Sequence, residues 1–92
     1  METMNVIDWV DFMDLTSQYG IDVVDLSQDE INFLKVNGML EDKKMMRYNV
    51  GTHKNPVYAY HTIGLRLINA LGVDGCHNRI KKFINEARAN YK

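Results

Sequence analysis

The residues best suited to chemistry are one cysteine and three histidines, all in the second half of the chain. A thiol and an imidazole act as nucleophile and base only within hydrogen-bond reach of each other. Cys76 and His77 are adjacent, and neighbouring side chains on a helix point about 100° apart. With His53 and His61 they match no standard zinc-ligand spacing. We therefore predict that Cys76 is a small buried apolar residue and that His77 lies on the flank of its helix.

Three aspartates, Asp8, Asp11 and Asp14, recur at a spacing of one helical turn and form a second candidate. Such a row could hold a divalent cation, but hard cations usually take ligands from a loop or from several elements. The same spacing is typical of a solvated helix face. The glycine-containing stretches "GVDG" and "VGTHKNP" do not fit a phosphate-binding fingerprint. We therefore expect no catalytic residues, no metal site and no cofactor.

The stretch "ALGVDGCHNRIKKF" is similar to a helix-turn-helix. Gly72 could lie in the turn, but the motif needs a small residue where Ile68 stands. The apolar anchor, Ile80, also comes two residues late. A DNA-reading role for the last helix is therefore kept only as the alternative function.

Charge is strongly segregated along the chain, although the net charge is only −1. Residues 1–42 contain ten acidic residues against one lysine, a net −9. Residues 43–92 contain ten basic residues against two acidic ones, a net +8. Such asymmetry indicates either a partner recognised by charge or pairing between the two halves.

We expect the charged side chains to form two partner-binding faces. The two faces either neutralise each other, within the chain or across a dimer, or face outward. An acidic half could also imitate nucleic-acid phosphates, and Tyr48, Tyr58 and Tyr60 could stack on bases or pack across strands. The basic face comprises Arg79, Lys81, Lys82, Arg88, Lys43, Lys44 and Arg47, and the acidic face comprises Asp8, Asp11 and Asp14.

Composition indicates a globular protein, with 46% hydrophobic and 25% charged residues in 92. We predict one domain over 1–92, with an acidic helical half (1–42) and a basic hairpin-plus-helices half (43–92). The chain has no apolar run long enough for a membrane span and no signal-peptide pattern. The single cysteine favours a reducing cytoplasm. Frequent Asn, Lys, Ile and Tyr are typical of AT-rich genomes, which suggests a phage or mobile-element origin.

Two helices are predicted in the acidic half. The first is capped by Asn5, runs to about residue 18 or 19, and ends at Gly20, with an apolar side that includes Val10 and Met13. After a short extended or turn segment, Ser27 and Glu30 form a capping box for the second helix. That helix, with Ile31, Phe33, Leu34 and Val36, is expected to end at Asn37 and Gly38.

The basic half is predicted to contain a β-hairpin over 45–60, with its loop at 52–55, and two helices. Thr62 would cap the first helix, which ends at Gly72, and Asp74 would cap the second, which runs to about Tyr91. The fold class is therefore α+β and helix-dominant: two helices, a central hairpin, two helices. The last helix is expected to bury Cys76, Ile80, Phe83, Ile84, Ala87 and Tyr91.

These features favour a small non-enzymatic binding protein, a regulator or inhibitor, that docks a charged surface onto a macromolecule. We favour a protein partner because no catalytic set is recognisable and the charge is bipolar. A nucleic-acid-binding regulator that uses the basic last helix is the alternative. Self-association is a further expectation for so short a chain.

Overall fold

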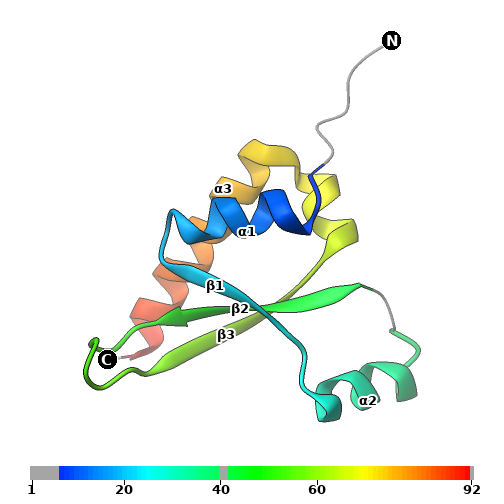
Figure 1. Cartoon of the computed structure of the whole chain (residues 1–92), viewed down its shortest axis with the longest axis horizontal. Helices are drawn as coiled ribbons and strands as arrows, with labels where there is room; N and C mark the ends of the chain where they lie inside the picture. Colours follow the sequence, from blue (N-terminus) through cyan, green and yellow to red (C-terminus); the bar gives the residue numbers. More distant parts are fainter. Residues whose placement is uncertain (1–6, 40–41, 92) are drawn as a thin grey trace.

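The computed structural model describes residues 7–39 and 42–91 of the chain. It places α1 (Trp9–Ser17), β1 (Ile21–Asp25) and α2 (Gln28–Val36) in the first half of the chain. Two longer strands, β2 (Lys43–Asn49) and β3 (Tyr58–Gly64), follow, and α3 (Leu65–Tyr91) ends the described part (Figure 1). The fold is a small α+β arrangement of these helices with an antiparallel three-stranded sheet.

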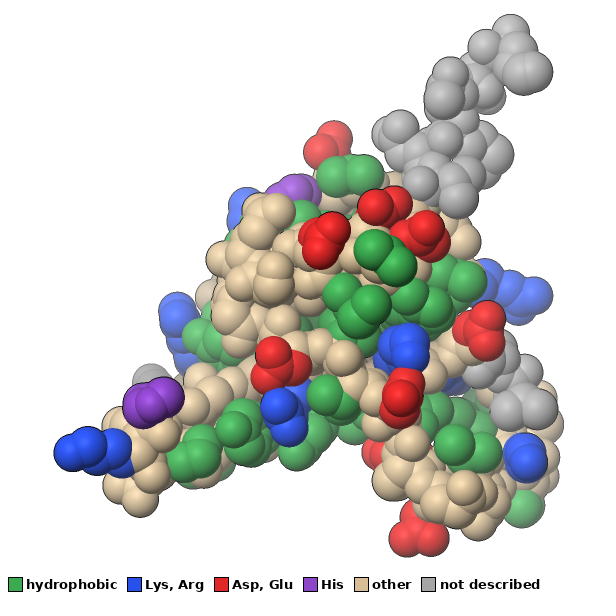
Figure 2. Space-filling model, in the orientation of Figure 1, with side chains coloured by type: hydrophobic (Ala, Val, Ile, Leu, Met, Phe, Trp, Pro, Cys, Tyr) green, Lys and Arg blue, Asp and Glu red, His purple; other side chains and the backbone are tan. Residues whose placement is uncertain are grey.

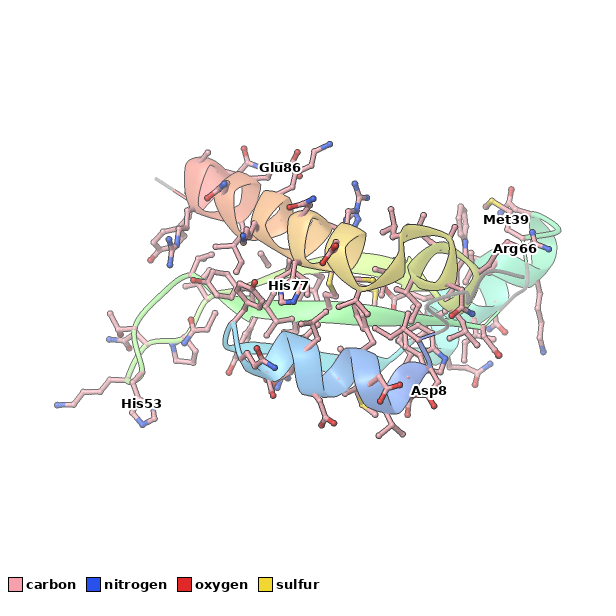
Figure 3. The ribbon with its side chains drawn as sticks, turned by 90° about the horizontal axis from the view of Figure 1, so that it is seen from above. Asp8, Met39, His53, Arg66, His77 and Glu86 are labelled. Atoms are coloured by element: carbon pink, nitrogen blue, oxygen red, sulfur yellow. The ribbon has the colours of Figure 1, made fainter. Side chains whose placement is uncertain are left out.

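The sheet has the strand order β1-β2-β3, and its two faces differ. Met46 lies opposite Val23 on β1 and opposite His61 on β3, on the face that α1 and α3 cover. Side chains alternate between the faces of a strand, so Arg47 and Tyr60 lie on the other, outer face. In Figures 1 and 3, α1 lies beside β1 and α3 lies along β3.

The core lies between the sheet and the two helices that cover it. Met46 from the central strand is fully buried, as is Phe12 from α1. The predicted inner face of the last helix is confirmed except for Tyr91, which is exposed. The buried residues of α3 are Ile68, Cys76, Ile80, Phe83, Ile84 and Ala87.

The described structure has three helices where four were predicted, because the two C-terminal helices continue as α3 across a break in helical geometry at Gly72, the predicted end of the first of them. Thr62 does not cap a helix; it lies in β3, and the helix begins at Leu65. Gly72 does interrupt the helical geometry, with φ 69° and ψ −178°, but it does so as a kink within α3. Asp74 accordingly lies inside α3 rather than before it.

The first helix also begins later than predicted. Asp8 is its N-cap, and Oδ1 of Asp8 accepts a hydrogen bond of 2.9 Å from the backbone N–H of Asp11. Asn5, the predicted cap, lies outside the described residues. Val10 and Met13 were expected on the apolar side but are 62% and 38% exposed, because the helix turns Phe12, Leu15 and Thr16 inward instead.

The capping box of α2 is confirmed. The Ser27 hydroxyl accepts a hydrogen bond from the backbone N–H of Glu30, and the Glu30 carboxylate accepts one from that of Ser27. The helix ends at Asn37 and Gly38, as predicted. Figure 1 shows α2 projecting from the body of the molecule, and Phe33 and Val36 are exposed as a result.

The hairpin differs from the prediction in extent and in context. Its strands reach from Lys43 and to Gly64, and Val50 N–H extends the ladder with a 2.8 Å hydrogen bond to the carbonyl of Val57. The segment after Gly20, predicted as extended or turn, is strand β1, which pairs with β2. Within the described ranges, no helix combines the length and the apolar character needed to cross a bilayer.

Candidate functional site

The side of α3 that faces α1 carries polar residues at intervals of about one turn. Burial of Ile80 and Ile84 against the sheet fixes how the helix is rotated. This rotation turns His77, Lys81 and Asn85 toward the end of α1 and the start of β1, where they line two hollows in the surface. Helical periodicity thus aligns side chains that are four residues apart.

The solvent-exposed side of α1 is acidic. Because Phe12 and Leu15 are buried, Asp11 and Asp14 are left exposed on the side that faces the first half of α3. Asp8 was predicted in the same acidic face, but it caps the start of α1. Figure 2 shows acidic side chains gathered over α1.

A hydrogen bond between Tyr19 and His77 joins the turn that follows α1 to α3. The Tyr19 hydroxyl lies 2.6 Å from Nδ1 of His77, and the two rings meet edge to face with centroids 5.7 Å apart. Figure 3 shows His77 between α1 and α3. We call this surface the α1–α3 seam; it comprises Asp11, Asp14, Gln18, Tyr19, Tyr48, His77, Lys81, Asn85 and Arg88.

The seam has an acidic end and a basic end, one on each side of the Tyr19–His77 hydrogen bond. The hollow at the acidic end has a volume of about 310 Å³ and contains Asp11 and Asp14. The hollow at the basic end has a volume of about 360 Å³ and is lined by Tyr19, Tyr48, Lys81, Ile84, Asn85 and Arg88.

The basic end is partly preorganised. Nη2 of Arg88 donates a hydrogen bond of 2.9 Å to the Tyr48 hydroxyl, and the guanidinium carbon lies 5.8 Å from the centre of the Tyr48 ring. The Tyr48 ring in turn packs edge-on against Phe83. Arg88 is therefore held in place while Lys81 stays exposed, and together they can bind a carboxylate or another anion.

Within the described residues, the charged side chains of the seam form no ion pairs with one another. Among residues 7–39 and 42–91, ion pairs join Asp25 to Lys44 and Asp22 to Arg47, on β1 and β2. The hydrogen bond that Arg47 donates to Asp22 raises the pKa of the Arg47 guanidinium. The acidic and basic halves of the sequence thus pair in part across these strands, and the seam keeps charges of both signs exposed.

The other residues predicted for the basic face lie elsewhere. Lys44 lies near the Trp9 ring and Arg47 lies on the outer face of the sheet. Lys43 lines a hollow beside α2. The structure therefore does not bring these β2 residues to the seam.

Arg79 and Lys82 lie on the side of α3 that faces β3. Nη2 of Arg79 donates a hydrogen bond of 2.8 Å to Nε2 of His61. Burial, together with the positive charges of Arg79 and Lys82, lowers the pKa of His61, which favours its neutral form. Lys81 and Arg88 are thus the only two residues of the predicted basic face that the described structure places at the seam.

Cys76 is fully buried, and its Sγ lies 3.6 Å from the carbonyl oxygen of Ile68. Burial raises the pKa of the Cys76 thiol, so the thiol stays protonated and is a poor nucleophile. His77 is turned away to Tyr19, as expected of neighbouring helical residues. Among the described residues, no three His, Cys, Asp or Glu side chains gather in a way that could hold a metal ion.

The predicted charged faces did not include Gln18, Tyr19, Tyr48, His77 and Asn85, which are seam residues, although Tyr48 was named as a residue that could stack on bases. The spacing of four between His77, Lys81 and Asn85 was a usable signal for three of the positions on α3. Nothing local marks Tyr19 or Tyr48, because each reaches the seam through contacts with residues far along the chain.

Comparison with known proteins gave no match: no family model, no curated protein and no solved structure resembles this chain significantly.

Proposed function

We propose that this protein is a small non-enzymatic binding module, a regulator or inhibitor, that docks the α1–α3 seam onto a protein partner. One observation carries the proposal: the seam exposes an acidic end and a basic end side by side, and neither is neutralised by an ion pair within the described residues. Exposed ion pairs contribute little to stability, so charges arranged in this way serve recognition better than folding.

The charge pattern favours a protein over a nucleic acid. The acidic and basic ends lie on either side of the Tyr19–His77 hydrogen bond. A phosphate backbone that ran along the seam from Lys81 would therefore meet the like charges of Asp11 and Asp14. A protein segment that carries a basic and an acidic group can satisfy both ends at once. The tyrosines and the arginine of the basic end are also residue types that contribute strongly at protein interfaces.

The experiment compares two seam variants with two control variants as immobilised baits. Asp11→Lys with Asp14→Lys reverses the acidic end, and Lys81→Glu with Asn85→Asp reverses the basic end. The controls, Lys54→Glu and Asp29→Lys, change exposed charges in the β2–β3 loop and on α2. Figure 3 shows His53, the neighbour of Lys54, far from the seam.

Each bait is exposed to an extract of the organism that encodes the protein, and the retained proteins are quantified. We expect the wild type and both controls to retain one protein in stoichiometric amount, and each seam variant to retain at least about tenfold less, equivalent to ~1.4 kcal/mol. Equal retention by seam variants and controls would contradict the proposal. All baits are first compared by circular dichroism to establish that they are folded.

A titration of duplex DNA at low salt tests the alternative function, nucleic-acid binding. Phosphate contacts are strongest at low ionic strength, so a DNA-binding protein should bind there. Two results together would replace the protein-docking proposal with the nucleic-acid one. Lys81→Glu with Asn85→Asp would have to abolish DNA binding, and Asp11→Lys with Asp14→Lys would have to strengthen it.

A further inference from the structure

Strand β3 has a free edge. The order β1-β2-β3 leaves β3 hydrogen-bonded to β2 on one side only within the described sheet. The seven residues of β3, "YAYHTIG", contain no Asp, Glu, Lys, Arg or Pro. The other edge strand, β1, carries Asp22 and Asp25. Charges and prolines are the usual protection of an edge against pairing with another chain, and β3 lacks both.

The side chains of β3 suit antiparallel pairing of the strand with itself. With Tyr60 opposite its own copy on a two-fold axis, Tyr58 lies opposite Thr62 and Ala59 lies opposite His61. Both pairs set a large side chain against a smaller one, and no charged side chains oppose each other. Tyr58, Tyr60 and Thr62 are exposed on the outer face, so a paired strand can reach them.

The charges on α3 beside this edge are complementary under the same axis. A two-fold perpendicular to the sheet places both copies of α3 on the same side, antiparallel to each other. Lys82 and Glu86 are exposed, one turn apart, and both act electrostatically on His61 of β3. Glu86 also lines the hollow of about 400 Å³ between β3 and the end of α3. Figure 3 shows Glu86 pointing away from α1.

We propose that a second copy of this chain pairs its β3 antiparallel with β3, joining the two sheets, with Lys82 of each copy facing Glu86 of the other. The occupant is a second copy because both the strand pattern and the charges of α3 are self-complementary. The surface is separate from the α1–α3 seam, so the dimer displays two seams, and the inference does not rest on the proposed function.

Sedimentation equilibrium over a range of concentrations tests the strand pairing. The wild type should fit a reversible dimer. Tyr60→Lys, which sets two lysines against each other on the axis, should raise the dimer dissociation constant by roughly tenfold or more. The control Phe33→Lys, on the projecting helix α2, should leave it unchanged. A wild type that stays monomeric at its highest soluble concentration overturns the proposal, as does a dimer that folded Tyr60→Lys does not weaken.

A charge exchange tests the contact between the α3 helices, and decides the matter if Tyr60→Lys fails to fold. Lys82→Glu leaves two acidic residues at this contact and Glu86→Lys leaves two basic ones, so each variant alone should dimerise more weakly than the wild type. Mixed one to one, the two variants should form a heterodimer, because each then meets the opposite charge. If both single variants dimerise as tightly as the wild type, the proposed contact is overturned.

Discussion

The hydroxyl of Tyr19 and Nδ1 of His77 are 2.6 Å apart, although the two residues are separated by 58 positions in the sequence. This hydrogen bond links the segment that ends α1 to the middle of α3. It also stands between the acidic and basic hollows, so the geometry of the candidate docking surface depends on it.

Removing this hydrogen bond should destabilise the fold by a small, measurable amount. Tyr19→Phe keeps the ring and deletes the hydroxyl, and the expected decrease in the free energy of unfolding is about 1 kcal/mol, the usual value for one hydrogen bond. Urea denaturation measures it. The control is Tyr91→Phe, which deletes the hydroxyl of an exposed tyrosine and should change nothing. Equal effects of the two substitutions would mean that the hydrogen bond contributes no stability.

Gly72 should not tolerate a side chain. Its φ of 69° with ψ of −178° lies in a region that is essentially restricted to glycine. We expect Gly72→Ala to lower the free energy of unfolding by about 1–3 kcal/mol in urea denaturation. Gly38→Ala is the matched control, because the φ of Gly38 is also positive, at 67°. Gly38 follows an exposed helix end, so we expect this substitution to lower the free energy of unfolding by only about 1 kcal/mol. A smaller loss at Gly72 than at Gly38 would contradict this account of the kink.

The capping box of α2 should act locally, because α2 projects from the body of the molecule and buries only Leu34. Ser27→Ala removes the hydroxyl that accepts the Glu30 N–H, which costs about 1 kcal/mol for a helix N-cap. The amides of α2 should therefore exchange with solvent roughly fivefold faster, while the global free energy of unfolding stays the same.

Amide hydrogen exchange followed by NMR measures this effect residue by residue. Asn32→Ala is the control, since it removes a different side-chain hydrogen bond of the same helix, the one from Gln28, and leaves both hydrogen bonds of the capping box in place. If Ser27→Ala slowed or left unchanged the exchange of α2, the capping box would not be what holds this helix.

Local signals explain the parts of the fold that the sequence could predict. The Ser27–Glu30 capping box and the end at Gly38 depend on residues within one helical turn, and both are confirmed. The inner face of α3 was also predictable, because helical periodicity alone groups residues such as Cys76 and Ile80. In each case the pattern that decides the structure is short and continuous in the sequence.

Strand β1 was not recognisable as part of the sheet for the opposite reason. It pairs with residues 44–48 of β2, which are distant along the chain. The five residues of β1 include aspartates at the second and last positions, and aspartate is depleted in strands, so this segment alone does not indicate a strand. Thr62 was misassigned as a helix cap because a capping residue before an apolar helix and a β-branched residue in a strand look alike locally.

The candidate site likewise combines residues that local sequence patterns indicate with residues that only distant contacts bring to it. Asp11, Asp14, Lys81 and Arg88 stand out from charge and spacing alone. Tyr48 does not, since it joins the seam only through the hydrogen bond that its hydroxyl accepts from Arg88, 40 residues later.

His61 should make the stability of the protein depend on pH. Arginine can only donate hydrogen bonds, so Nε2 of His61 must accept the 2.8 Å hydrogen bond from Arg79 and carry no proton. Burial, Arg79 and Lys82 lower the pKa of His61, while Glu86 opposes them. The unfolded chain, with an ordinary histidine pKa of about 6.5, therefore binds more protons than the folded one between the two pKa values. The free energy of unfolding should fall as the pH is lowered through this window, and this loss should level off below the folded-state pKa.

Urea denaturation at a series of pH values from neutral to mildly acidic measures this dependence. Carboxylates also contribute to the slope in acid, so the informative quantity is the difference between the wild type and a variant. His61→Gln removes the titrating group, and its free energy of unfolding should vary less with pH than that of the wild type. His53→Gln deletes an exposed histidine of the β2–β3 loop and should keep the wild-type slope. If the His61→Gln slope matched the wild type instead, protonation of His61 would not be coupled to unfolding, and the Arg79–His61 hydrogen bond would not hold the neutral form.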